Sequence, residues 1–260
     1  MAKLDTAFQF TGRIEELTFF KRQGSDQIII RRAVGHSRDR LKKDPKFARV
    51  RDNNNEFKAV NKTAKLIHDG LHYVHPIFDH IVYNSLVSRI KSIQKLNIAD
   101  RGKRNILLSE HGQLLENIPF NKKFRLEDII LISLQPELDA EAMTARLNIP
   151  SLRPGIHYKN PTNLPFLQFR FLVQAIPDVK WENNEYSPRH TSCLVKAAQS
   201  EWYNCTQTFP ATELKIDIPD SYLGHTIIIS LGIAFSKGDD GPVKYIGAGR
   251  IIKVEPLSKF

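Results

Sequence analysis

Basic side chains are the residues of this chain whose type and spacing could do chemistry. Nine of them lie between positions 31 and 51: Arg31, Arg32, Arg38, Arg40, Lys42, Lys43, Lys46, Arg49 and Arg51. Lysine and arginine on one accessible surface can bind phosphates, and each neutralised phosphate releases counterions. Phe19 and Phe20 precede the set, and an exposed aromatic ring could stack on a base. We therefore predict that these nine residues form a nucleic-acid-binding surface.

The distribution of charge along the chain supports a polyanion partner for this region. The net charge is +10. Residues 1–104 hold 22 basic and 11 acidic side chains, whereas residues 105–260 hold 16 and 17. Such an asymmetry between halves is a sign of a polyanion partner, although a well-hydrated surface without a partner, or a surface that docks an acidic protein, has the same composition. The chain has no zinc-finger, RNP or homeodomain signature, so the sequence does not support base-specific recognition.

Four histidines and two aspartates form a second cluster, which could bind a metal ion. They are His68, Asp69, His72, His75, Asp79 and His80. Zinc accepts two imidazoles and a carboxylate, and the spacing of His68 and His72 fits one helix face. However, Gly70 and Pro76 interrupt the helix that would align the ligands, and no His-Glu-x-x-His motif is present. We predict a polar turn between helices, with neither a metal nor a cofactor.

Motifs of catalysis are missing from the sequence. There is no Walker A, G-x-G-x-x-G or G-x-S-x-G pattern. Ser88 and Lys91 match S-x-x-K, but the partner K-T-G motif is absent. Cys193 and Cys205 lack a neighbouring histidine motif, and two cysteines do not make a disulfide framework. We therefore expect a protein without enzymatic activity.

Hydropathy indicates a soluble chain. The N-terminal residues hold no apolar run of seven or more, so no signal peptide is visible. The longest apolar run, residues 227–235, is interrupted by Ser230 and Gly232 and is far shorter than the roughly 18 residues of a membrane span. We expect a cytoplasmic protein that does not contact a membrane.

The elements that must position the basic residues are predicted to be a hairpin and helices. Residues 14–21 and 27–32 are typical of two strands around a turn at 23–26. Asp44 and Pro45 mark a helix start, and Gly70 marks its end. An apolar stripe predicts either one long helix with a weak centre at residues 53–55 or two helices: Phe47, Val50, Phe57, Val60, Ala64, Ile67 and Leu71. Pro76 is predicted to start a further helix that ends near Asn97. Its apolar stripe is Phe78, Val82, Leu86, Ile90 and Ile93.

The remainder of the chain is predicted to be an antiparallel β-sandwich. Seven candidate strands are separated by clusters of Pro, Gly, Asn and Asp: residues 129–134, 143–149, 167–175, 192–198, 213–218, 226–235 and 245–254. Charge and periodicity change together near Arg104. We therefore predict an α+β protein of two domains, a basic hairpin-plus-helices unit at 1–105 and a β-sandwich domain at 106–260.

Several short motifs in the first 105 residues resemble an uncharacterised family of Bacteroidota proteins. The motifs are GRIEELTFFK at 12–21, IIRR at 29–32, SRDR at 37–40 and a DPxFxRxRxNxxEF helix at 44–57. The resemblance implies a bacterial protein with an N-terminal hairpin, an arginine pair and a β-rich second half. It assigns no activity and no functional residue. Glu15 and Glu16 depart from the small or neutral turn residues expected there.

Two main functions remain open on the sequence alone, beside a third and weaker one, an enzyme or a carbohydrate binder that works from the loops of the sandwich. In the first, the basic N-terminal unit is a non-enzymatic binding module for a polyanion, nucleic acid above all. In the second, the protein is structural, and its N-terminal unit self-associates as a homo-oligomer or joins a larger particle. The composition of the basic region is compatible with both.

Overall fold

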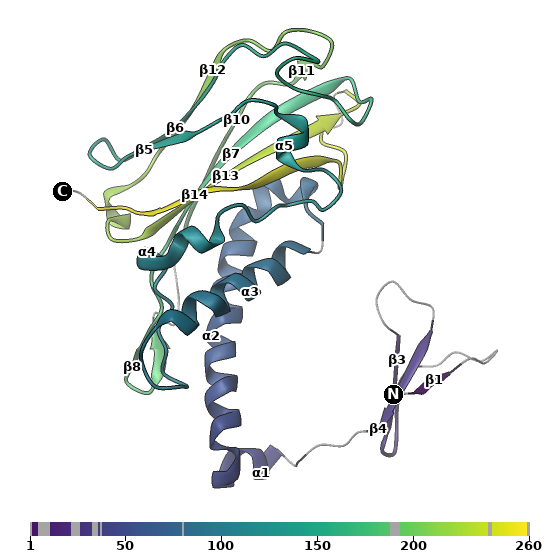
Figure 1. Cartoon of the computed structure of the whole chain (residues 1–260), viewed down its shortest axis with the longest axis vertical. Coiled ribbons are helices and arrows are strands. Elements are labelled where there is room, and N and C mark those ends of the chain that lie inside the picture. Colours follow the sequence, from purple (N-terminus) through teal and green to yellow (C-terminus); the bar gives the residue numbers. More distant parts are fainter. Residues whose placement is uncertain are drawn as a thin grey trace. The chain divides into compact units, whose positions relative to one another are not determined.

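The structure is a computed structural model that describes most of the chain. The described residues are 2–4, 11–21, 27–32, 36, 38–79, 81–187, 193–238 and 241–258, with the backbone alone for 2–4 and His75. The chain divides into two compact units, Met1–Arg51 and Asp52–Phe260. The predicted α+β class is confirmed, because strands come first, helices follow, and antiparallel sheets make up the second half (Figure 1).

The first unit begins with a four-stranded antiparallel sheet. Its strands are β1 (Ala2–Leu4), β2 (Gly12–Ile14), β3 (Leu17–Lys21) and β4 (Ile28–Arg32), in the order β1-β4-β3-β2. The predicted hairpin is confirmed as β3 and β4, but its first predicted strand, residues 14–21, is wrong at its start, because a turn separates Ile14 from Leu17. The predicted turn at residues 23–26 lies outside the described residues. Glu15 and Glu16 form the tight turn between β2 and β3, where Glu15 has a φ of 48°.

Helices follow the sheet. They are α1 (Arg38–Lys43), the 3₁₀ turn η1 (Pro45–Phe47) and α2 (Ala48–Gly70). Asp44 caps the start as predicted, because its side chain accepts a hydrogen bond from the Lys46 amide at 3.0 Å. Of the two predicted alternatives, the single long helix is correct. Its stripe is buried only in the C-terminal half, since Val50 and Phe57 are exposed.

The predicted helix start at Pro76 is wrong. Pro76 lies inside the 3₁₀ segment η2 (Leu71–Ile77), and α3 spans Ile81–Leu96. The cap is Asp79, whose carboxylate accepts the Ile81 amide at 2.8 Å. The predicted apolar stripe of this helix is otherwise confirmed, and its buried members are Val82, Leu86, Ile90 and Ile93.

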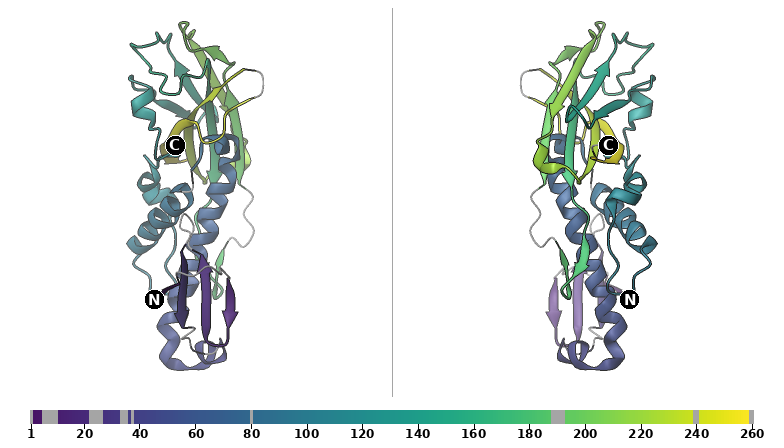
Figure 2. Two further views of the ribbon diagram at one scale, coloured as in Figure 1. Left: turned by 90° about the vertical axis from the view of Figure 1, so that its right-hand side faces the viewer. Right: turned by 90° about the vertical axis from the view of Figure 1, so that its left-hand side faces the viewer.

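Two antiparallel sheets form the predicted sandwich (Figures 1 and 2). The large sheet has the order β10-β7-β13-β14, with β11 also paired to β7; its strands are β7 (Phe166–Ile176), β10 (Leu194–Gln199), β11 (Tyr203–Asn204), β13 (Thr226–Ser236) and β14 (Gly247–Pro256). The small sheet consists of β5 (Pro136–Asp139), β6 (Thr144–Ile149) and β12 (Thr212–Asp217), in the order β12-β6-β5. A separate hairpin pairs β8 (Lys180–Glu182) with β9 (Glu185–Ser187).

The large sheet is a middle layer that is buried on both faces. Along β7, Phe169 and Phe171 point into the core shared with the small sheet, while Leu172 and Ile176 belong to a second core. This second core also contains the buried side chains of α2, η2 and α3. Burial on both faces explains why β13 is a nearly continuous apolar run.

The second core explains why the division of the chain differs from the predicted boundary near residue 105. Buried side chains of α2 and α3 share one apolar cluster with side chains of the large sheet, and almost all of both helices belongs to the unit of Asp52–Phe260. The change in charge and period near Arg104 marks a change of secondary structure within one core. It does not mark a gap between two cores.

One predicted strand is also wrong. Residues 129–134 join no sheet: Ile129 ends the short helix α5 (Leu126–Ile129), and Ile130 forms only an isolated antiparallel bridge with Tyr158. The Ile130 amide donates to the Leu126 carbonyl at 2.8 Å, and the Leu131 amide donates to His157 at 2.9 Å. These bonds use the backbone groups that a strand would offer to a neighbour. Three other short turns are α4 (Leu108–His111), η3 (Gly112–Leu115) and η4 (Asp220–Tyr222).

Candidate functional site

Seven of the nine predicted cations lie on one short stretch of the first unit. We call residues 38–51 the basic segment; it comprises α1, η1 and the first turn of α2. It carries seven basic and two acidic side chains. Its basic residues are Arg38, Arg40, Lys42, Lys43, Lys46, Arg49 and Arg51. The structure therefore places most of the predicted set on three consecutive helical elements.

Two of these arginines hold the basic segment together. The Arg51 guanidinium donates to the carbonyl oxygens of Leu41 at 3.0 Å and Asp44 at 2.9 Å. Arg40 forms an ion pair with Asp44 at 3.4 Å, and its guanidinium lies 5.9 Å from the centre of the Phe47 ring. Arg51 thus satisfies carbonyls at the end of α1, where helix termini leave acceptors free. These contacts fix how α1 meets the start of α2.

The other five cations of the basic segment are exposed and have no ion pair or side-chain hydrogen bond within the described part of the chain. They are Arg38, Lys42, Lys43, Lys46 and Arg49. The only acidic side chains of the segment are Asp39 and Asp44, and Asp44 is already engaged by Arg40. The segment thus presents an excess of positive charge to solvent on an ordered backbone. A surface with such an excess of one sign of charge attracts ions of the opposite sign.

The remaining two predicted cations lie at the end of β4. Arg31 lies 5.6 Å from the centre of the Phe20 ring, and Arg32 forms an exposed ion pair with Glu16 at 2.6 Å. Phe19 is buried and Phe20 is half-buried beneath Arg31. Phe19 is therefore not available to stack on a base.

The histidine cluster is a set of aromatic contacts. His68 packs against Phe78 and Tyr83, with ring centres 5.9 and 5.6 Å apart, and His72 packs on Tyr73 at 3.9 Å. His80 and the side chain of His75 lie outside the described residues. Within the described residues, no three histidine, cysteine or acidic side chains are grouped as metal ligands.

The cysteines are not placed for nucleophilic chemistry. Both are free in the structure, Cys205 buried and Cys193 half-buried. Burial raises the pKa of the Cys205 thiol to about 11 and raises that of Cys193 as well. Because the thiolate is the nucleophile, these protonated thiols are poorly reactive near pH 7.

The most buried charge of the second unit has a structural explanation. Glu56 is 1% exposed, and its carboxylate accepts hydrogen bonds from Lys91 at 2.7 Å and from the Gly102 amide at 2.8 Å. Burial raises the pKa of Glu56, but these two hydrogen bonds and the charges of Lys91 and Arg104 outweigh that effect, so the pKa lies below its usual value. The ionised carboxylate ties the turn around Gly102 to α2 and α3.

Comparisons with known proteins add no relative. No family model, curated protein or solved structure matches the chain. Within the described residues, no helix combines the length and the apolar character that crossing a bilayer requires. The resemblance to Bacteroidota proteins and the cytoplasmic location stay predictions.

Proposed function

We propose that this protein is a non-enzymatic binding protein whose N-terminal unit contacts nucleic acid through phosphates. The observation that carries the proposal is the group of five exposed cations on the basic segment without an anionic partner among the described residues. Phosphate contacts supply affinity without reading base edges. The binding is therefore expected to show little preference for sequence.

A variant that removes four of these cations tests the proposal. Arg38, Lys42, Lys43 and Lys46 are replaced by Ala, while Arg40, Asp44 and Arg51, which hold the segment together, are kept. Fluorescence anisotropy measures binding to duplex and single-stranded DNA and RNA at several salt concentrations. Each phosphate contact contributes about 0.9 to the slope of log affinity against log salt on duplex DNA, so the variant is expected to lose about 3 to 4 units of slope.

A control variant with the same loss of charge separates this surface from general electrostatics. Arg153, Lys159, Lys180 and Lys215 are exposed cations of the second unit, and they are replaced by Ala. The control is expected to keep nearly all of the salt dependence. Binding no tighter than about 100 μM at low salt, or equal slopes for the two variants, would contradict the proposal.

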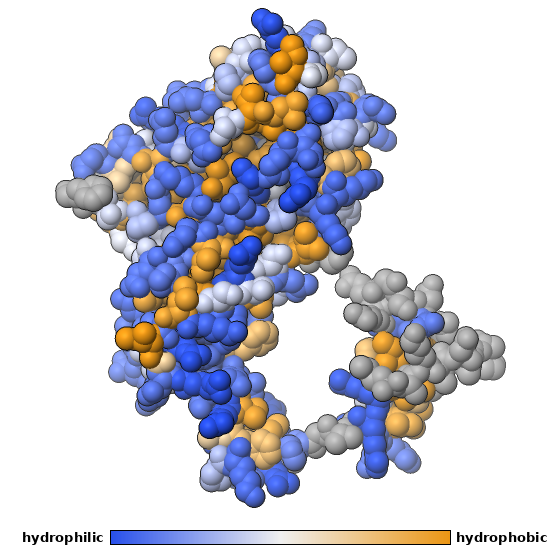
Figure 3. Space-filling view, in the orientation of Figure 1, coloured by the Kyte–Doolittle hydropathy of each residue, from blue (hydrophilic) through white to orange (hydrophobic). Residues whose placement is uncertain are grey.

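A second function, assembly, is favoured by the small core of the N-terminal sheet. Among its described side chains only Phe19 and Ile28 are buried, while Ile14 is 55% and Leu17 is 42% exposed. Figure 3 shows hydrophobic side chains at the surface of this sheet beside strongly hydrophilic ones. A small sheet gains stability by packing its apolar face on another element. A second copy of the chain or a larger particle could supply that element.

Size-exclusion chromatography with light scattering distinguishes the two functions. A nucleic-acid binder without assembly elutes as one chain at high salt, and its absorbance ratio shows nucleic acid only at low salt. An assembly protein elutes as a larger species that persists at high salt, because apolar contacts are not screened by ions. Replacing Ile14 and Leu17 by Ser is expected to dissociate such a species and to leave nucleic-acid binding intact.

A further inference from the structure

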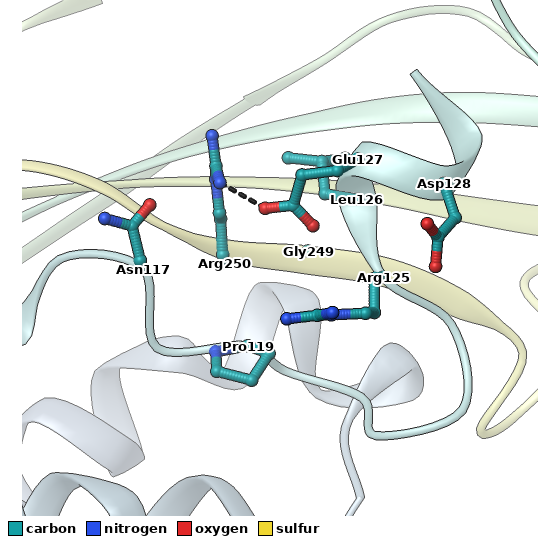
Figure 4. A pocket seen from close by; sticks show the side chains of 8 residues that line it. All are labelled: Asn117, Pro119, Arg125, Leu126, Glu127, Asp128, Gly249 and Arg250. Atoms are coloured by element: carbon teal, nitrogen blue, oxygen red, sulfur yellow. Dashed lines mark hydrogen bonds and ion pairs between the residues drawn. The ribbon is translucent and has the colours of Figure 1, made fainter. Parts of the chain in front are cut away.

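A cleft in the second unit lies beside the edge strand of the large sheet. β14 is the last strand of that sheet, and residues 117–120 bond to its free edge. The Asn117 amide donates to the Ile251 carbonyl at 2.9 Å, and the Phe120 amide donates to the Gly249 carbonyl at 2.8 Å. A turn follows, in which the Asn121 side chain accepts hydrogen bonds from the amides of Lys123 and Phe124, and the chain then enters α5. Residues 117–120 and α5 thus form two walls with β14 between them (Figure 4).

Glycine at position 249 lets Phe120, in the first of these walls, lie close to the large sheet. A Cβ at Gly249 would lie 2.7 Å from the Leu231 carbonyl oxygen and 2.7 Å from the Phe120 ring. Only a residue without a side chain fits between the neighbouring strand and Phe120. The next residue, Arg250, therefore lies at a fixed place in the floor of the cleft, which has a volume of about 350 Å³.

Two arginines and an amide line the polar part of this cleft. Arg250 forms an ion pair with Glu127, and its buried Nε–H has no hydrogen-bond partner in the described part of the chain. Arg125 has no ion pair with a described residue. Figure 4 shows the Arg125 side chain extending over Pro119, while the Arg250 side chain points away from it and meets the Glu127 carboxylate. Arg125, Arg250 and Asn117 all line this cleft.

The lining holds two arginines and two carboxylates, and Arg125 is the arginine that forms no ion pair with a described residue and can bind an anion. Glu127 neutralises Arg250, which leaves the charge of Arg125 without compensation on that side. The other acidic residue of the lining is Asp128. Figure 4 places its carboxylate at the backbone end of Arg125, away from the guanidinium and from Arg250. A planar guanidinium binds a carboxylate through two parallel hydrogen bonds.

An apolar hollow adjoins the polar one. It has a volume of about 380 Å³ and shares Leu126, Glu127 and Arg250 with the first. Its other walls are mostly aliphatic: Ile130, Leu131, Ile132, Leu134, Leu231 and Ile252. Volumes of this size fall within the range of small-molecule sites, which combine apolar walls with a few placed polar groups.

We propose that the two hollows together bind a small molecule with a carboxylate head and an apolar tail. Arg125, Arg250 and Asn117 bind the carboxylate, and the aliphatic walls around Leu131 and Leu134 cover the tail. Glu127 keeps Arg250 in place, so it positions the head without touching it. This site is independent of the basic segment, because every residue that forms it belongs to the second unit.

The first experiment is a titration of the full chain with octanoate, in which NMR or calorimetry measures binding. Ligands of about ten heavy atoms bind weakly, so a dissociation constant of about 1 mM is expected. Octylamine carries the same tail with a positive head, and acetate carries the head without a tail. Both are expected to bind at least about tenfold more weakly than octanoate, since each loses one of the two sets of contacts.

Variants then locate the binding. Arg125→Gln is expected to weaken octanoate binding about tenfold or more, because a hydrogen bond to a charged group is lost. Arg125→Lys keeps the charge but not the planar fork, and an intermediate loss is expected. The matched control is Arg153→Gln, an exposed arginine elsewhere in the second unit, which is expected to bind octanoate like the unchanged chain. Leu131→Ser is expected to weaken octanoate binding and to leave acetate binding unchanged.

The same titration on the variant that lacks Arg38, Lys42, Lys43 and Lys46 excludes binding at the basic segment. Octanoate affinity is expected to be the same in that variant. Three results would overturn the proposal: no octanoate binding at about ten times the expected dissociation constant, equal binding of octanoate and octylamine, or an Arg125→Gln variant with unchanged affinity. Thermal unfolding of each variant shows that its fold is intact, since Arg125 and Leu131 are both exposed.

Discussion

The two units of the chain differ in how they use charge and apolar surface. Residues 1–51 carry 13 basic and 6 acidic side chains, and the described core of their sheet is Phe19 and Ile28. Residues 52–260 carry 25 basic and 22 acidic side chains, and they bury two large apolar clusters on the two faces of one sheet. Stability is therefore concentrated in the second unit, whereas excess charge is concentrated in the first. A region that contributes little to the core is free to present charge.

Of the changes that test this difference between the units, truncation is expected to have the largest effect on folding. A chain of residues 52–260 keeps both apolar clusters and is expected to fold. A chain of residues 106–260 loses α2, η2 and α3 and exposes the sheet face that contains Leu172, Ile176 and Ile228. A contiguous exposed apolar face promotes aggregation. Circular dichroism and light scattering of the two fragments check this expectation.

The outcome separates two descriptions of the helices. If the shorter fragment is soluble, β-rich and as stable as the longer one, then α2 and α3 do not belong to the sandwich unit. The boundary would then lie near residue 105, as charge and periodicity predict. If only the longer fragment folds, the boundary lies where the apolar clusters place it.

Local signals in the sequence account for much of the fold. The Asp44 cap, the stop at Gly70 and the stripe from Val82 to Ile93 depend on neighbours in the chain, and the structure contains each of them. Long strands such as β13 are also visible, because a strand buried on both faces must be apolar throughout. Each of these features is settled by residues within a few positions of one another.

Features that depend on distant residues could not be predicted. The apolar stripe of α2 shows which face of the helix can be buried. It does not show how much of that face another part of the chain covers, so the sequence near Val50 and Phe57 could not predict that both are exposed. Residues 129–134 look like a strand, yet their backbone bonds to residues 157 and 159. Arg125 and Arg250 lie more than a hundred positions apart, and no spacing rule brings them to one cleft. The cations of the basic segment were found because they are close in sequence.

The next largest effect is expected when one side chain of the second core is replaced. Leu86 of α3 is fully buried, and Leu86→Ala is expected to lower the free energy of unfolding by about 3 kcal/mol. Leu17→Ala in the N-terminal sheet is the matched control, and its exposed side chain is expected to contribute less than about 1 kcal/mol. Chemical denaturation measures both. A larger loss for Leu17→Ala would show that the N-terminal sheet carries more of the stability than its core suggests.

Replacing Glu56 tests how much the buried carboxylate of the second unit contributes to stability. Glu56→Gln is expected to lower the free energy of unfolding by about 2 kcal/mol at pH 7, because Lys91 and the Gly102 amide lose a charged acceptor. The folded-state pKa lies below the usual 4.5, so the ionised carboxylate stabilises the fold above that pH. This contribution is lost as the pH falls through the folded pKa. The difference between the two proteins should therefore shrink below about pH 4.5, and a constant difference down to pH 2 would contradict this role.

The smallest expected effect on stability belongs to an exposed ion pair of the first unit. Glu16 and Arg32 are both solvent-exposed, so Glu16→Gln is expected to change the free energy of unfolding by less than about 0.5 kcal/mol. The same change frees Arg32 for a phosphate, and the salt slope of nucleic-acid binding should steepen by up to about 0.9. Glu213→Gln, which releases the exposed Arg146 of the second unit, is the matched control and should leave that slope unchanged. A steeper slope for Glu16→Gln alone would extend the nucleic-acid surface from the basic segment to β4, and identical slopes would confine it to residues 38–51.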